Sequence, residues 1–79
     1  MRYFFHLRAD GEQLLDPDGR ELPSLEAAQA ATLREARALI SHDALAGHIR
    51  LDQRLDVETG EGRVVHSLSL TDAVTITGL

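Results

Sequence analysis

The chain has 79 residues, with 13 acidic and eight basic side chains and a formal net charge of −5. This length allows one small domain, residues 1–79, whose thin core makes self-association an expected source of extra stability. The absence of cysteine excludes disulfides and thiol catalysis, and the absence of lysine excludes Schiff-base and P-loop chemistry.

Nothing in the chain resembles a targeting or membrane segment. Residues 1–8 are too short and too interrupted by charge for a signal peptide, and no apolar run approaches the roughly 20 residues of a membrane span. We therefore expect a cytoplasmic protein without membrane contact. The acidic balance also opposes general attraction to phosphate backbones.

Residues 3–8 are aromatic and β-prone, which predicts a first strand. Because side chains alternate along a strand, Tyr3, Phe5 and Leu7 share the more apolar face. The opposite face carries Phe4, His6 and Arg8.

Turn signals punctuate the next segment. Asp10-Gly11 predicts a hairpin turn into a short second strand over residues 12–16. Asp16-Pro17-Asp18-Gly19 has the composition of a further turn, and residues 20–22 allow a few more extended positions. Pro23 ends any such strand.

A single amphipathic helix is predicted from Leu25 onward, with Ser24 as its N-cap. It spans about 17 residues at the 3.6-residue period. The sequence leaves open whether residues 42–46 extend it to a stop at Gly47. Its expected core-facing stripe consists of Leu25, Ala28, Thr32, Leu33, Ala36, Leu39 and Ile40.

The C-terminal half predicts a β-hairpin. Alternation of apolar and polar residues indicates a strand at residues 55–58, and Thr59-Gly60-Glu61-Gly62 reverses the chain. Residues 63–70 return, with His66 expected to face the helix and Val65 to face away from it. A terminal strand over residues 74–77 remains open.

These elements predict an α+β domain of order β-β-α-β-β, with extra edge strands at either end left open. The small antiparallel sheet packs on the one helix, which covers one face. We expect the other face to be an interaction surface that contains Phe4, His6, Arg8 and Val65. The partner is expected to be a second copy of the chain or another protein.

Two segments carry a resemblance to a known family. Residues 2–8 read Arg-Tyr-Phe-Phe-His-Leu-Arg, and residues 21–28 read Glu-Leu-Pro-Ser-Leu-Glu-Ala-Ala. Together with Leu55-Asp56-Val57 and Gly62-Arg63-Val64, they resemble a family of short bacterial proteins classed as a domain of unknown function. The family has Asp where this chain has Ser24, and both are good N-caps. The resemblance implies a stand-alone bacterial domain and transfers no catalytic residue.

The beginning of the helix, Leu25-Glu26-Ala27-Ala28, is also similar to that of an antitoxin family with a strand–strand–helix core. That similarity keeps open an antitoxin-like regulatory role. A single-stranded nucleic-acid interface at the exposed sheet face is a further alternative, because aromatic side chains flanked by Arg2 and Arg8 suit base stacking. The net charge disfavours it.

No catalytic, cofactor or metal site is predicted. The four histidines, His6, His42, His48 and His66, lack the short spacing of metal ligands. Gly60-x-Gly62 lies between strands, outside the context of a dinucleotide site. No serine lies in a nucleophile motif. We therefore expect a domain that is not an enzyme, and the sequence assigns no catalytic or metal-binding role to His6 or His66.

Overall fold

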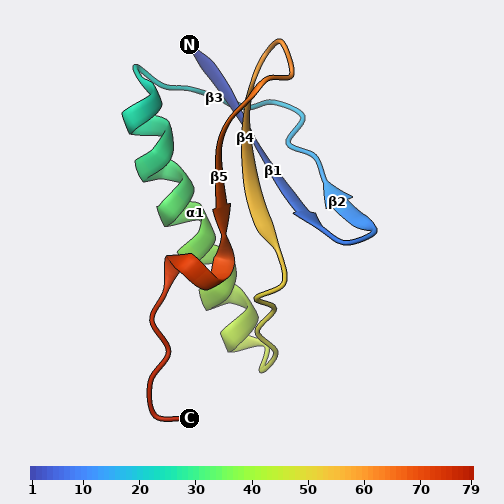
Figure 1. Ribbon diagram of the computed structural model, residues 1–79, viewed down its shortest axis with the longest axis vertical. Helices are drawn as coiled ribbons and strands as arrows, with labels where there is room; N and C mark the ends of the chain where they lie inside the picture. Colours follow the sequence, from blue (N-terminus) through green and yellow to red (C-terminus); the bar gives the residue numbers. More distant parts are fainter.

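The computed structural model describes residues 1–79 and has an antiparallel five-stranded sheet with one α-helix, as the sequence predicted (Figure 1). The elements in chain order are β1 (Arg2–Ala9), β2 (Glu12–Leu14), β3 (Arg20–Glu21), α1 (Leu25–Leu45), β4 (Arg54–Thr59), β5 (Val64–Ser69) and the 3₁₀ helix η1 (Leu70–Ala73). None of the helices is long and apolar enough to cross a lipid bilayer.

The strands lie in the order β2-β1-β4-β5, and β3 also pairs with β1. β2 pairs with residues 7–9 of β1, whereas β3 pairs with residues 2–3. Both short strands therefore share one edge of β1 and leave residues 4–6 between them without a strand partner on that side. β3 is the extra N-terminal edge strand that the sequence left open.

The helix begins and ends at its predicted signals. The Ser24 side chain accepts a hydrogen bond of 3.1 Å from the Ala27 backbone N–H, which is the N-cap interaction. Gly47 has a φ of 83° directly after the C-cap residue, a conformation that glycine adopts without strain. Residues 42–45 continue the helix, so α1 has 21 residues and not about 17.

The core lies between α1 and the odd-numbered residues of β1 and β4. Tyr3, Phe5 and Val57 pack on Ala28 and Ala31 in the first half of the helix. A second cluster joins Ala36, Leu55, Leu70 and Ala73. The alanines allow the helix to approach the sheet closely, since they add little volume between the layers. Ala31 is buried although it was not in the predicted stripe, and Leu25 is 41% exposed although it was.

The helix covers only part of its own side of the sheet. It packs on β1, β4, β5 and η1, and β2 lies at the far side of the molecule (Figure 1). A hollow of about 330 Å³ therefore opens between α1 and residues 14–17, with Leu7 and Leu39 among its lining residues. Leu14 and Leu15 are 70% and 51% exposed beside it. One helix did not close this face, contrary to the sequence expectation.

A β-bulge corrects the predicted phase of β5. Val57 pairs with His66, but Glu58 pairs with Val64, so Val65 is the extra residue. His66 thus shares the helix side with Val57, as expected. Val65, which was predicted to face away from the helix, packs against the cluster of Tyr3, Phe5 and Val57. Its assignment to the interaction surface was wrong, because the extra residue reverses the alternation.

The C-terminal residues do not form the strand that was left open. After β5 the chain turns into η1, whose Leu70 and Ala73 are buried. The Arg37 guanidinium donates to the Ala73 carbonyl at 2.8 Å, which fixes η1 against the helix. Residues 74–79 follow without regular secondary structure.

Candidate functional site

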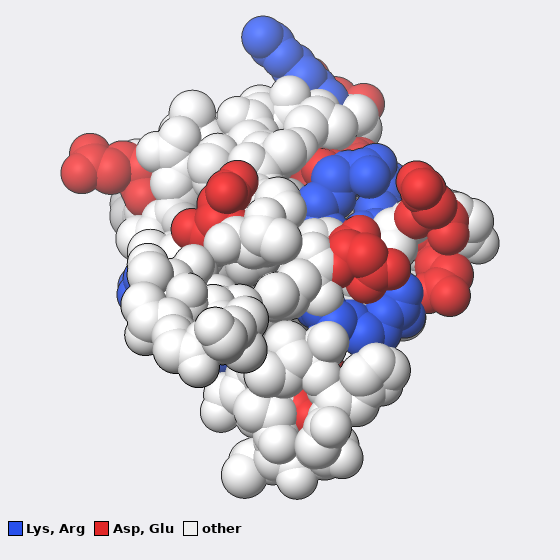
Figure 2. Space-filling view, turned by 60° about the horizontal axis from the view of Figure 1, so that its bottom comes forward, with Lys and Arg blue, Asp and Glu red and all other residues white.

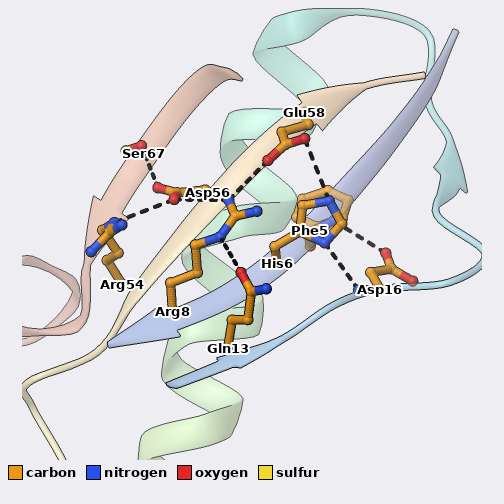
Figure 3. A network of polar contacts seen from close by, with 9 residues as sticks. All are labelled: Phe5, His6, Arg8, Gln13, Asp16, Arg54, Asp56, Glu58 and Ser67. Carbon is orange, nitrogen blue, oxygen red and sulfur yellow. Dashed lines mark hydrogen bonds and ion pairs between the residues drawn. The ribbon is translucent and has the colours of Figure 1, made fainter. Parts of the chain in front are cut away.

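Charged side chains gather on the sheet face that points away from α1 (Figure 3). Three of the residues predicted there, Phe4, His6 and Arg8, share this face because they alternate with the core residues of β1. Asp56 and Glu58 of β4 lie beside them, since His6 is opposite Asp56 and Phe4 is opposite Glu58.

Asp56 separates two arginines that the register places directly opposite each other. Arg8 and Arg54 are cross-strand partners, an arrangement that is unfavourable for like charges. The Asp56 Oδ2 atom accepts from Arg8 Nη1 at 3.1 Å and from Arg54 Nε at 3.2 Å. The carboxylate therefore neutralises a repulsion that the strand pairing creates.

Asp56 is also the most enclosed charge of the network, with only 5% of the residue exposed. Its second oxygen accepts a hydrogen bond of 2.6 Å from the Ser67 hydroxyl of β5. Burial acts to raise the pKa of Asp56, but the hydrogen bonds from Ser67 and Arg8 and the charge of Arg54 outweigh it and hold the pKa below its ordinary value. The carboxylate is thus fixed in its ionised form.

Arg8 extends the network to a second carboxylate. Its Nη1 atom donates to Glu58 Oε2 at 2.8 Å, and its Nε atom donates to Gln13 Oε1 at 3.2 Å. Hydrogen bonds to Glu58 and to Asp56 raise the pKa of Arg8 further above its ordinary value. On the other side, His6 Nε2 lies 3.7 Å from Glu58 Oε1.

Asp16 joins the network to the open stretch of the β1 edge. Its Oδ2 atom accepts from the Phe5 backbone N–H at 3.1 Å, the group that lacks a strand partner between β2 and β3. Its Oδ1 atom accepts from the N–H groups of Asp18 and Gly19, and its own N–H donates to His6 Nδ1 at 3.0 Å.

The same bonds set the protonation of Asp16. Partial burial acts to raise its pKa, but the N–H groups of Gly19, Phe5 and Asp18 outweigh that effect and lower the pKa below its ordinary value. One ionised side chain therefore takes the place of a strand over this part of the edge.

Phe4 is half-buried against the same turn and is not a free contact residue. Its ring is stacked on that of His6, with centroids 6.3 Å apart and planes inclined by 14°. A Cβ atom added to Gly19 would lie 3.0 Å from the Phe4 ring and 2.7 Å from the Tyr3 carbonyl oxygen. Glycine at this position thus lets the turn approach β1 closely.

The charges of this face cancel. Arg8 and Arg54 balance Asp56 and Glu58, and each of these groups has at least one oppositely charged partner. Figure 2 shows arginines interleaved with carboxylates on one side of the view and a broad uncharged area beside them. No group of three or more His, Asp and Glu side chains is arranged to hold a metal ion.

Sequence reasoning found only one side of this network. It identified His6 and Arg8 from the alternation of β1, but missed Asp16, Asp56 and Glu58. The alternation of residues 55–58 placed Asp56 and Glu58 on the face opposite Leu55 and Val57, so the β4 partners were readable from that pattern. The contact of Asp16 with β1 is not encoded in any local spacing.

The two edges of the sheet differ sharply. The β2–β3 edge is interrupted, bears Glu12, Arg20 and Glu21, and is closed between its short strands by Asp16. β5 forms the other edge, and no segment pairs with its outer side. Residues 64–69 include no charged residue and no proline. Charged residues and short strands protect a sheet edge from pairing with another chain. The β2–β3 edge has both features, whereas the regular part of β5 has no charged residue.

The backbone groups available on β5 follow from its register. Leu70 N–H donates to the Gln53 carbonyl at 3.0 Å, on the β4 side. Because backbone groups alternate between the two edges of an antiparallel strand, Leu68 and His66 also point to β4. Ser67 and Ser69 therefore direct their N–H and C=O groups outward.

Comparisons with known proteins give one match. Residues 2–71 match the model of a protein family described as a domain of unknown function (DUF6894). Among the curated proteins and the solved structures, none matches the chain significantly.

Proposed function

This chain belongs to the DUF6894 family of domains of unknown function, and we propose that it is a non-catalytic domain that binds another protein chain. The binding surface in this proposal is the outer edge of β5. The observation that carries it is the contrast between the two sheet edges, one closed by charge and by Asp16 and the other open along β5.

An open edge binds by strand addition. An extended partner segment pairs with the N–H and C=O groups of Ser67 and Ser69, so main-chain hydrogen bonds supply affinity. The side chains of β5 do not oppose this, since residues 64–69 contain no Asp, Glu, Lys or Arg. Pairing of Ser67 and Ser69 with a partner strand breaks no hydrogen bond within the chain, because β4 bonds to the backbone groups of His66 and Leu68 instead.

The charged face supports the non-catalytic part of the proposal. A general acid or base needs a pKa near the working pH, but the pKa of Asp56 and that of Asp16 are lowered and that of Arg8 is raised. Hydrogen bonds within the chain occupy these groups. The network therefore supports a structural role in holding β1, β4 and β5 together.

Two variants at one position test the proposal. Ser67→Pro removes the outward N–H and places a ring at the edge, whereas Ser67→Ala keeps the N–H. Both lose the hydroxyl bond to Asp56, so the alanine variant controls for that loss. We expect a protein retained from the native cell extract by the wild type and by Ser67→Ala to be lost with Ser67→Pro. Equal retention by all three folded proteins would contradict the proposal.

A single-stranded nucleic-acid interface is the second candidate, and the stacked rings of Phe4 and His6 favour it. The arginines nearby weaken it, because Arg8 is engaged by two carboxylates and Arg2 by Glu21 and the Asp18 carbonyl. Fluorescence anisotropy with single-stranded oligonucleotides at low and high salt decides between the two. Salt-sensitive binding at micromolar protein would favour this candidate.

A further inference from the structure

The regular outer edge of β5 is short. The bulge disturbs the strand at Val65, and η1 begins at Leu70, so residues 66–69 form the regular segment between the two. Within it, Ser67 and Ser69 direct their backbone groups outward, and Ser67 is exposed and lies farther from η1. The Ser67 N–H and C=O both point outward, the arrangement that antiparallel pairing between two identical strands requires at a two-fold axis.

Charge complementarity indicates which partner fits. Arg63 precedes β5 and Asp72 follows it in η1, and both are exposed without an ion-pair partner in the chain. Antiparallel pairing of two β5 strands brings the Arg63 end of one copy alongside the Asp72 end of the other. Residues 64–69 between these ends contain no Asp, Glu, Lys or Arg, so the pairing sets no like charges from these residue types opposite each other, although each chain carries a net charge of −5.

We propose that the partner of the β5 edge is a second copy of this chain, paired antiparallel about a two-fold axis at Ser67. This inference rests on the proposed function, of which it specifies the partner. The pair extends each sheet across the axis into one continuous sheet. Ser67 of one copy then lies opposite Ser67 of the other, and Ser69 lies opposite Val65.

Cysteine substitutions test this register, since the chain contains no other cysteine. Hydrogen-bonded antiparallel partners have Cα atoms about 5.5 Å apart, within the range of a disulfide. In Ser67→Cys the two thiols are such partners. In Ser69→Cys the two positions are four residues apart along the strand, about 14 Å, which is too far.

We expect Ser67→Cys to form a disulfide dimer under mild oxidation and Ser69→Cys to form little or none. Efficient crosslinking of Ser69→Cys would overturn the inference. Failure of both variants to crosslink would also overturn it. Reduction should return the crosslinked species to the equilibrium of the wild type.

Light scattering from micromolar to millimolar protein provides the independent measurement. The wild type and Ser67→Ala should approach about 17 kDa, twice the 8.7 kDa of one chain, and Ser67→Pro should stay at one chain mass. Dimeric Ser67→Pro would overturn the inference and the proposed edge together. A wild type that is monomeric throughout would overturn the second copy alone, because selective loss of a captured protein with Ser67→Pro would still support the proposed function.

Discussion

The His6 Nδ1 atom accepts a hydrogen bond of 3.0 Å from the backbone N–H of Asp16, ten residues further along the chain. An imidazole nitrogen that accepts carries no hydrogen, so the neutral ring has its hydrogen on Nε2, which faces Glu58. The bond ties the turn of residues 16–19 to β1. It gives His6 a structural role that the sequence did not assign.

A matched pair of substitutions at His6 tests this role. His6→Leu leaves the part-buried Asp16 N–H without an acceptor and should lower the free energy of unfolding by about 1–3 kcal/mol. His6→Asn offers an amide oxygen near the position of Nδ1 and should recover a large part of the stability that His6→Leu loses. Chemical denaturation measures both. Equal destabilisation by the two variants would contradict the acceptor role, as would an NMR spectrum of the Nδ1–H tautomer in the wild type.

Gly19 should tolerate alanine far less well than Gly11. Both have a positive φ, of 69° and 74°, and alanine in this region costs about 1 kcal/mol. A Cβ atom at Gly11 meets nothing within 4 Å, whereas at Gly19 it meets the Tyr3 carbonyl at 2.7 Å. The midpoint temperature of thermal unfolding should therefore be clearly higher for Gly11→Ala than for Gly19→Ala. Equal midpoint temperatures would show that the turn at Gly19 does not pack closely against β1.

The lowered pKa values of Asp16 and Asp56 predict that the folded protein loses stability in acid. Both have a pKa that folding lowers, so their contribution is fully present above the unfolded value of about 3.9 and is lost as the pH falls through the folded value. Urea denaturation between pH 7 and pH 2 should show a free energy of unfolding that declines below about pH 4.

Asp56→Asn should make that decline shallower, because one of the two linked groups is gone. The substitution should also lower stability at neutral pH, since it leaves Arg8 opposite Arg54 without the charge between them. An unchanged pH dependence in this variant would mean that folding does not lower the pKa of Asp56.

Thr59 presents the opposite case of a buried polar group without a partner. Its residue is 8% exposed and its hydroxyl makes no hydrogen bond. Thr59→Val replaces the hydroxyl by a methyl group of similar size and should raise the free energy of unfolding by up to about 1 kcal/mol. Thr32→Val is the control, because the Thr32 hydroxyl donates to the Ala28 carbonyl at 2.7 Å. Its replacement by a methyl group should not raise the free energy of unfolding. Denaturant midpoints of the two variants decide the point.

The sequence by itself determined the local elements, because their signals act over a few residues. The Ser24 N-cap and the glycine at position 47 delimit the helix, and side-chain alternation separates Tyr3 and Phe5 from Phe4 and His6. The element order β-β-α-β-β, to which the structure adds the short strand β3, and the family resemblance follow from the same local patterns.

Only the tertiary structure decided where these elements meet. One extra residue in β5 moved Val65 from the predicted outer face into the core, since strand alternation has a period of two and any insertion reverses it. Asp16 forms hydrogen bonds with Phe5 and His6, which lie ten or more residues earlier in the chain. The register of β1 and β4 places Asp56 between Arg8 and Arg54. Such contacts depend on how the strands pair in space, which short-range spacing does not specify.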